Sequence, residues 1–166
     1  MRTLSSGGAL AVLVILLAAC GGSPADSASA QAIQEDADLY RITDIERKWH
    51  EATTTHDIDL MMSLWADDAT FTVDAGTTLT GKDEIREFWL GARPFQPENQ
   101  WVSETPAYKL SATVNGDKGT LYFECHYVDA KTGKLERVTA ADGDVARING
   151  RWLLTNLAGA SATLSP

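Results

Sequence analysis

Three side chains that alternate along one predicted strand have the strongest potential for chemistry. Tyr122, Glu124 and His126 share one face of that strand, because successive residues of a strand point to opposite faces. A carboxylate beside an imidazole can orient the ring as a general base, which would abstract a proton from carbon or activate water. The same polar row is typical of a solvated face or a dimer interface, so all three interpretations stay open.

The other candidate nucleophile and the candidate metal ligands have less support. Cys125 points away from His126, so the two do not form a thiolate-imidazole pair, and we expect Cys125 in the core. The chain has three histidines without HxxxH or HxH spacing. We therefore expect no metal site and no cofactor.

Helical periodicity is confined to the first half of the chain. Apolar residues from Leu39 to Ala52 recur at steps of three and four, which predicts a first helix from Asp38 with one buried face. Asp57 is the expected N-cap of a second helix that closes at residues 67–68 and carries on one side Leu60, Met61, Leu64 and Trp65. A third helix is predicted from Thr80, with capping-box spacing, to Gly91.

The second half changes to the period of two that is typical of strands. The predicted strands cover residues 101–114, 119–128, 135–148 and 151–158, after a short hairpin of residues 70–74 and 77–79. Within the third long strand, Asp142-Gly143 fits a bulge better than a turn. Helices followed by strands predict an α+β domain with the helices on one face of the sheet.

The segment from Trp49 to Trp89 contains THDIDLMMSLWADDATF and TGKDEIREFW. It resembles the opening half of SnoaL-like domains in the nuclear-transport-factor-2-like superfamily. The resemblance implies a cone-shaped roll, in which a curved antiparallel sheet and three N-terminal helices enclose a pocket, with the domain spanning residues 36–160.

The resemblance also suggests site residues. Ketosteroid isomerases of this superfamily use a carboxylate base, and a tyrosine with a protonated aspartic acid as oxyanion donors. In this comparison Trp49 occupies the position of the catalytic tyrosine and Val73 that of the carboxylate base. The chain therefore lacks these two isomerase residues at the matching positions. Asp74 lies one residue beyond the base position, where a strand residue points to the other face. It could act as the base only if the short strand is bulged, so it is a reserve candidate. Asp144 matches the oxyanion aspartic acid and joins Glu124 and His126 as a catalytic candidate.

The same comparison predicts the walls of the pocket. The expected lining residues are Trp49, Phe71, Val73, Tyr122 and Leu153. Their flat apolar surfaces suit a ring-shaped or acyl ligand.

The sequence of the N-terminus predicts an export signal. Arg2 precedes an apolar run too short to span a bilayer stably, and the run ends in Leu17-Ala18-Ala19-Cys20, which resembles a bacterial lipobox. We expect residues 1–19 to be removed, Cys20 to carry lipid, residues 20–35 to form a flexible tether, and residues 161–166 to be a tail. The protein would then be anchored in the cell envelope, at the outer membrane or the outer face of the plasma membrane.

Charge limits the partners of the chain. The 166 residues have a formal net charge of −9, which becomes −10 when the signal and its Arg2 are removed. Such acidity excludes nucleic acid as an expected partner. The leading hypothesis is a membrane-tethered domain that binds a small apolar molecule. The alternatives are an acid-base isomerase, cyclase or hydrolase, and a module that forms a homodimer or docks an envelope partner.

Overall fold

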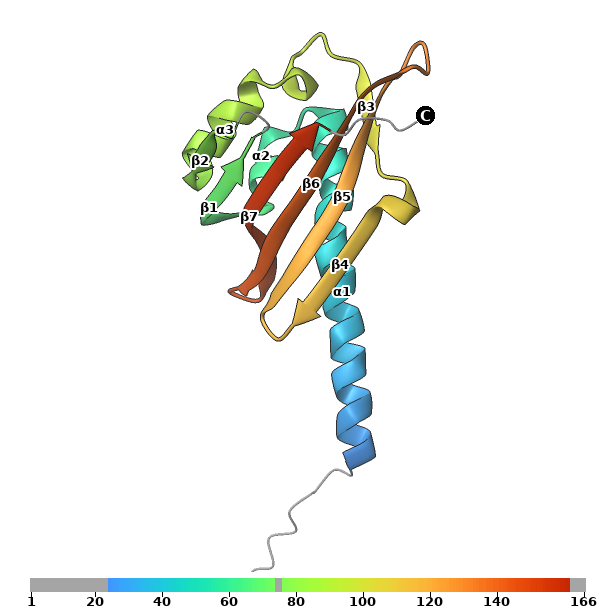
Figure 1. The fold of residues 1–166 in the computed structure, drawn as a ribbon, viewed down its shortest axis with the longest axis vertical. Helices are drawn as coiled ribbons and strands as arrows, with labels where there is room; N and C mark the ends of the chain where they lie inside the picture. The colour runs from blue at the N-terminus through green and yellow to red at the C-terminus, as the bar shows by residue number, and fades with distance from the viewer. Residues whose placement is uncertain (1–23, 74–75, 162–166) are drawn as a thin grey trace, which may run out of the picture.

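The computed structural model describes residues 24–73 and 76–161 (Figure 1). In chain order the elements are α1 (Pro24–Thr55), α2 (Ile58–Met62), β1 (Trp65–Thr72), β2 (Thr78–Thr80), α3 (Gly81–Gly91), η1 (Arg93–Phe95), β3 (Trp101–Glu104), η2 (Ala107–Lys109), β4 (Leu110–Asn115), β5 (Lys118–Asp129), β6 (Leu135–Ile148) and β7 (Arg151–Ser161). The two η elements are single turns of 3-10 helix.

The strands form one curved sheet in the order β2-β1-β7-β6-β5-β3, and β4 also pairs with β5. The pairs are antiparallel except for β1 with β7, which is parallel. Figure 1 shows the helices on one side of this sheet, with the core between the two layers. The predicted α+β architecture is confirmed.

The second half of α1 supplies the apolar face that the sequence predicts. Ile42, Ile45, Trp49 and Ala52 are all buried, and the Trp49 ring meets Phe123 of β5 edge to face at 5.3 Å between centroids. This face spans the concave side of the sheet. It therefore fixes the position of Trp49 relative to the central strands.

Asp38 joins the start of this buried face to the ends of β6 and β7. Its carboxylate accepts hydrogen bonds from Gln34, Arg41, Arg147 and the Trp152 indole. Burial alone would raise the pKa of Asp38, but the bonds from Gln34, Trp152 and Arg147 outweigh it and hold the pKa well below its ordinary value. The charged carboxylate therefore pins α1 to the sheet.

The first half of α1 differs from the expected tether. The helix begins at Pro24, and residues 27–36 are exposed and extend beyond the sheet (Figure 1). Low apolar content correctly indicates the lack of burial. It does not exclude helix, because Ala and Gln are strong helix formers and Pro suits a first helical turn. No helix among the described residues is long and apolar enough to cross a membrane.

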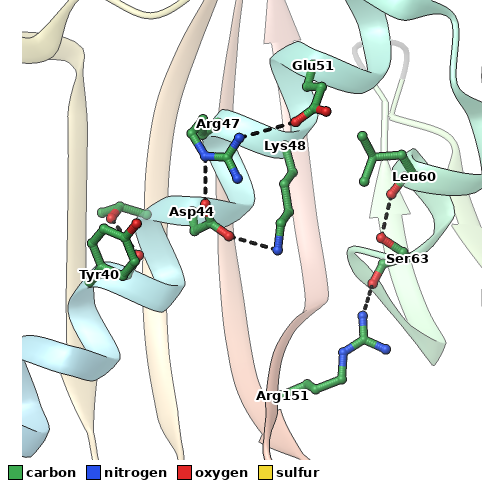
Figure 2. Close-up of polar contacts among 9 residues, drawn as sticks. Tyr40, Asp44, Arg47, Lys48, Glu51, Leu60, Ser63 and Arg151 are labelled. Atoms are coloured by element: carbon green, nitrogen blue, oxygen red, sulfur yellow. Dashed lines mark hydrogen bonds and ion pairs between the residues drawn. The ribbon is translucent and has the colours of Figure 1, made fainter.

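The solvent side of α1 is covered by ion pairs. Figure 2 shows Asp44 between Arg47 and Lys48, at 2.7 and 2.8 Å, and Arg47 also reaching Glu51 at 3.2 Å. These pairs lie at the spacing of three and four residues that faces side chains together on a helix. They leave the opposite face of α1 for the sheet.

The second helix and the strand after it depart from the prediction. Asp57 caps α2, accepting from the Leu60 amide at 2.9 Å, but α2 ends at Met62 and β1 begins at Trp65. In Figure 2, Arg151 of β7 donates to the Ser63 carbonyl just after α2. The chain therefore turns into the sheet earlier than the apolar pattern of residues 60–65 suggests.

The structure departs from the prediction at the first long strand, and it agrees with the prediction that no turn lies at Gly143. The predicted strand 101–114 is divided into β3 and β4, because Pro106 cannot donate to a ladder and begins the η2 turn. Strand β6 runs unbroken through Gly143, which excludes a turn there, and its register with β7 shifts between Asp144 and Val145. A Cβ at Gly143 would lie 2.3 Å from the Asn156 carbonyl oxygen, so the close approach of β7 requires glycine.

Candidate functional site

A cavity of about 620 Å³ lies between the helical layer and the concave face of the sheet. Its walls come from the helical elements α1, α3 and η1 and from the strands β1, β3, β5, β6 and β7, with β5 contributing its odd-numbered face. The aromatic lining residues are Trp49, Phe71, Phe88, Trp89, Trp101 and Tyr127. A volume of this size accommodates a small multi-ring molecule.

The aromatic rings form a continuous packed wall. Trp89 meets Trp49 edge to face at 5.0 Å between centroids and stacks on Phe71 at 6.0 Å with only 6° between the planes. The indole N–H groups of Trp49 and Trp89 are buried and have no hydrogen-bond partner among the described residues. The packed rings make the wall mainly an apolar surface.

The deep end of the cavity disfavours negative charge. Burial raises the pKa of the Cys125 thiol to about 12. Burial also raises the pKa of the Tyr127 hydroxyl well above its ordinary value, with Cys125 adding to the shift. Both groups stay neutral at physiological pH, so neither is a ready base or nucleophile.

The charged lining residues lie at the rim. Glu87, Arg93 and Arg137 all line the cavity and are exposed. The Arg93 guanidinium sits 4.9 Å from the centroid of the Trp101 ring, a cation-π contact. The cavity thus has an apolar interior and a charged mouth.

Three of the predicted lining residues are part of this wall, and two are not. Trp49, Phe71 and Val73 line the cavity. Tyr122 lies on the opposite face of β5 from the lining residue Tyr127. Leu153 is half-buried against the core and does not line the cavity, because it points to the opposite face of β7 from its buried neighbours Trp152 and Leu154.

Glu124 and His126 are brought together, but outside the cavity. Glu124 is only 6% exposed and accepts from Tyr122 at 3.0 Å, while its second oxygen lies 3.1 Å from the His126 ring. Lys109 forms an ion pair with the same carboxylate at 2.9 Å. The bond from Lys109 is the main reason that the pKa of Glu124 falls to about 2, with His126 and Tyr122 adding to it. This closed ion cluster is a structural feature of the outer sheet face.

We expect Glu124 to make the free energy of unfolding depend on pH in the acidic range. Its folded pKa of about 2 lies below the ordinary 4.5, so its contribution is complete above pH 4.5 and is lost as the pH falls toward 2. A shift of this size corresponds to about 3 kcal/mol. Urea unfolding of Glu124→Gln and wild type should therefore differ most at neutral pH and converge near pH 2. A difference that stays constant with pH, or an equal effect of the exposed control Glu98→Gln, would contradict this account.

The remaining catalytic candidates do not join this cluster or the cavity. Asp144 is exposed, pairs with Thr120 across the ladder, and receives a bond of 3.3 Å from Asn156. It is not one of the residues that line the cavity. Asp74 lies outside the described residues, as does Cys20. The convergence of the carboxylates on one cavity, which the enzyme hypothesis predicts, does not hold for Glu124 and Asp144.

A second polar cluster ties α1 to β3. The His50 ring contacts Ser103 and Thr105, each at 2.5 Å, and Glu46 at 3.0 Å. These contacts direct the His50 ring toward β3 at the margin of the sheet. Among the described residues no three potential metal ligands group together.

Most of the lining residues are not among those expected from the sequence, and they include Cys125, Tyr127, Thr139, Arg93 and Arg137. Polar content marks the even-numbered face of β5 as the chemical one, yet the apolar odd-numbered face encloses the cavity. The useful signal is the burial pattern of β5, in which small Cys125 lies between large Phe123 and Tyr127. A small residue among large ones leaves space in front of the sheet.

Comparisons with known structures agree on the architecture. A nuclear-transport-factor-2-like protein with a cystatin-like fold from Novosphingobium aromaticivorans superposes with a TM-score of 0.68 and 18% identity, over 87% of this chain and 94% of that one. A protein of the nuclear-transport-factor-2-like family from Streptomyces avermitilis, assigned as a dehydratase, superposes with a TM-score of 0.60 and 16% identity, over 77% of this chain and 98% of that one. A Novosphingobium aromaticivorans protein assigned as an aromatic ring hydroxylase superposes with a TM-score of 0.60 and 23% identity, over 78% of this chain and 91% of that one. At these identities the likeness concerns the fold alone.

Sequence comparison identifies the family. No curated protein sequence matches the chain. A family model for the SnoaL-like domain matches residues 47–154, which is more than half of the chain and covers most of the cavity wall. The chain belongs to the SnoaL-like domain family.

Proposed function

We propose that this protein is a lipid-anchored receptor of the bacterial cell envelope, whose SnoaL-like domain binds a small apolar molecule with fused or flat rings. The observation that carries the proposal is the cavity of about 620 Å³ with its packed aromatic wall. Such a wall gives a planar ligand a large contact area at little cost in side-chain ordering.

The chemistry of the lining favours binding over acid-base catalysis. Cys125 and Tyr127 stay neutral in the deep end. Among the described lining residues Glu87 is the only carboxylate, and it lies exposed on α3 at the rim. An isomerase, cyclase or hydrolase would need a base placed against the buried part of its substrate. For that reason we rank the enzyme hypothesis second.

Anchoring follows from the sequence, through the lipobox that ends at Cys20. The exposed first part of α1 adds a spacer: a helix from Pro24 to residue 37 is about 20 Å long at 1.5 Å per residue. The spacer would hold the cavity away from the bilayer, where small molecules of the envelope can enter it. The export, the choice of membrane and the homodimer remain predictions.

Titration with 1-aminoanthracene tests the binding function. This neutral three-ring probe becomes more fluorescent in an apolar environment and fits the cavity volume. We expect saturable binding of one probe per protein, with quenching of the tryptophans in the wall. A linear, unsaturable response would count against a ligand-binding cavity.

A further inference from the structure

The cavity has its two arginines next to one aromatic pair. The Arg93 guanidinium packs on the Trp101 ring at 4.9 Å, and Trp101 lies 5.7 Å from the Tyr127 ring, between centroids. Arg137 of β6 lies directly opposite Tyr127 of β5 in the backbone ladder that joins the two strands. Both arginines therefore flank the Trp101–Tyr127 pair, on one side of the cavity mouth.

The charges at this mouth oppose the charge of the chain as a whole. Among the described lining residues three are charged, namely the cations Arg93 and Arg137 and the carboxylate Glu87, so positive groups are in the majority. The whole chain carries −9. A local positive mouth on an acidic protein selects for an anionic group at short range, since guanidinium groups bind carboxylates in a planar, paired geometry.

We infer that the ligand is an anionic amphiphile, with an apolar ring system held in the aromatic interior and a carboxylate held at the mouth by Arg93 and Arg137. This inference rests on the proposed function and names its ligand class. The opposite orientation is disfavoured, because Cys125 in the wall is only 1% exposed, and a carboxylate buried beside this thiol would lose its hydration.

Three fluorescent probes that differ in their head group test the orientation and the charge. They are 1-pyrenebutyrate, 1-pyrenebutanol and 1-pyrenebutylamine, which share the ring system and the four-carbon chain and carry a negative, neutral and positive group. We expect the carboxylate to bind about tenfold more tightly than the alcohol, as one charge-assisted contact allows, and the amine to bind most weakly. The preference should shrink as salt is added.

Two arginine variants test which residues cause the preference for the carboxylate over the alcohol. Arg93→Gln and Arg137→Gln should each reduce the carboxylate-to-alcohol ratio severalfold while the affinity for the alcohol stays within about twofold. The matched control is Arg86→Gln, which removes an arginine of α3 that pairs with Asp59 and lies outside the cavity lining. It should leave the ratio unchanged.

The outcomes separate this inference from the proposed function. Equal binding of carboxylate and alcohol, or tighter binding of the amine, overturns the anionic ligand class and leaves the apolar pocket standing. A carboxylate preference that persists in both arginine variants overturns the assigned residues. Failure of all three probes and of 1-aminoanthracene overturns the proposed function itself.

Discussion

Replacing Ala141 with phenylalanine should abolish binding of 1-aminoanthracene while the protein stays folded. Ala141 is 5% exposed and lies on β6 in the cavity wall, opposite Gly159 of β7. A benzyl group at this position points into the space that a ligand would fill. We expect affinity to fall by at least about 100-fold, which corresponds to about 2.7 kcal/mol. Fluorescence titration measures this loss, and urea unfolding checks the fold.

The same substitution on the other face of the sheet provides the control. Ala158 is exposed on β7 and pairs with Asp142, next to the Ala141–Gly159 pair. Ala158→Phe adds the same group without entering the cavity, so binding should match the wild type. Wild-type affinity in Ala141→Phe, with an unchanged unfolding transition, would show that the probe binds elsewhere.

Replacing Cys20 with serine should remove lipid from the protein completely. Only a thiol at this position can accept the diacylglycerol, and two or more acyl chains are needed for durable anchoring. Cells that grow with radiolabelled palmitate should therefore label the wild type, and the label should be absent from Cys20→Ser. The control is Cys125→Ala, which removes the buried second cysteine and should keep the label. An unlabelled wild type would contradict the lipobox interpretation.

The sequence predicts the parts of this fold that depend on local pattern. The spacing of Ile42, Ile45 and Trp49 identifies the buried face of α1, and Asp57 identifies the start of α2. Such features need only the geometry of one helix and its cap. Composition is a weaker guide, since residues 27–36 are exposed yet helical.

The candidate site is harder to predict because it depends on distant pairings. Alternation on β5 divides its residues into two faces but does not show which face meets the helices. The polar face, with Glu124 and His126, closes into its own ion cluster with Lys109. The parallel pairing of β1 with β7 brings Phe71 beside Leu157 across more than eighty residues, and no local signal encodes it. Arg93 and Arg137 likewise meet the cavity only through the packing of η1 and β6.

Native mass spectrometry of the protein purified in detergent from its own host tests the central claim most directly. The account predicts that the wild type carries a small acidic molecule of constant mass and that Ala141→Phe, purified in the same way, carries none. A wild type with no bound mass, or the same mass on both proteins, would contradict a ligand in this cavity.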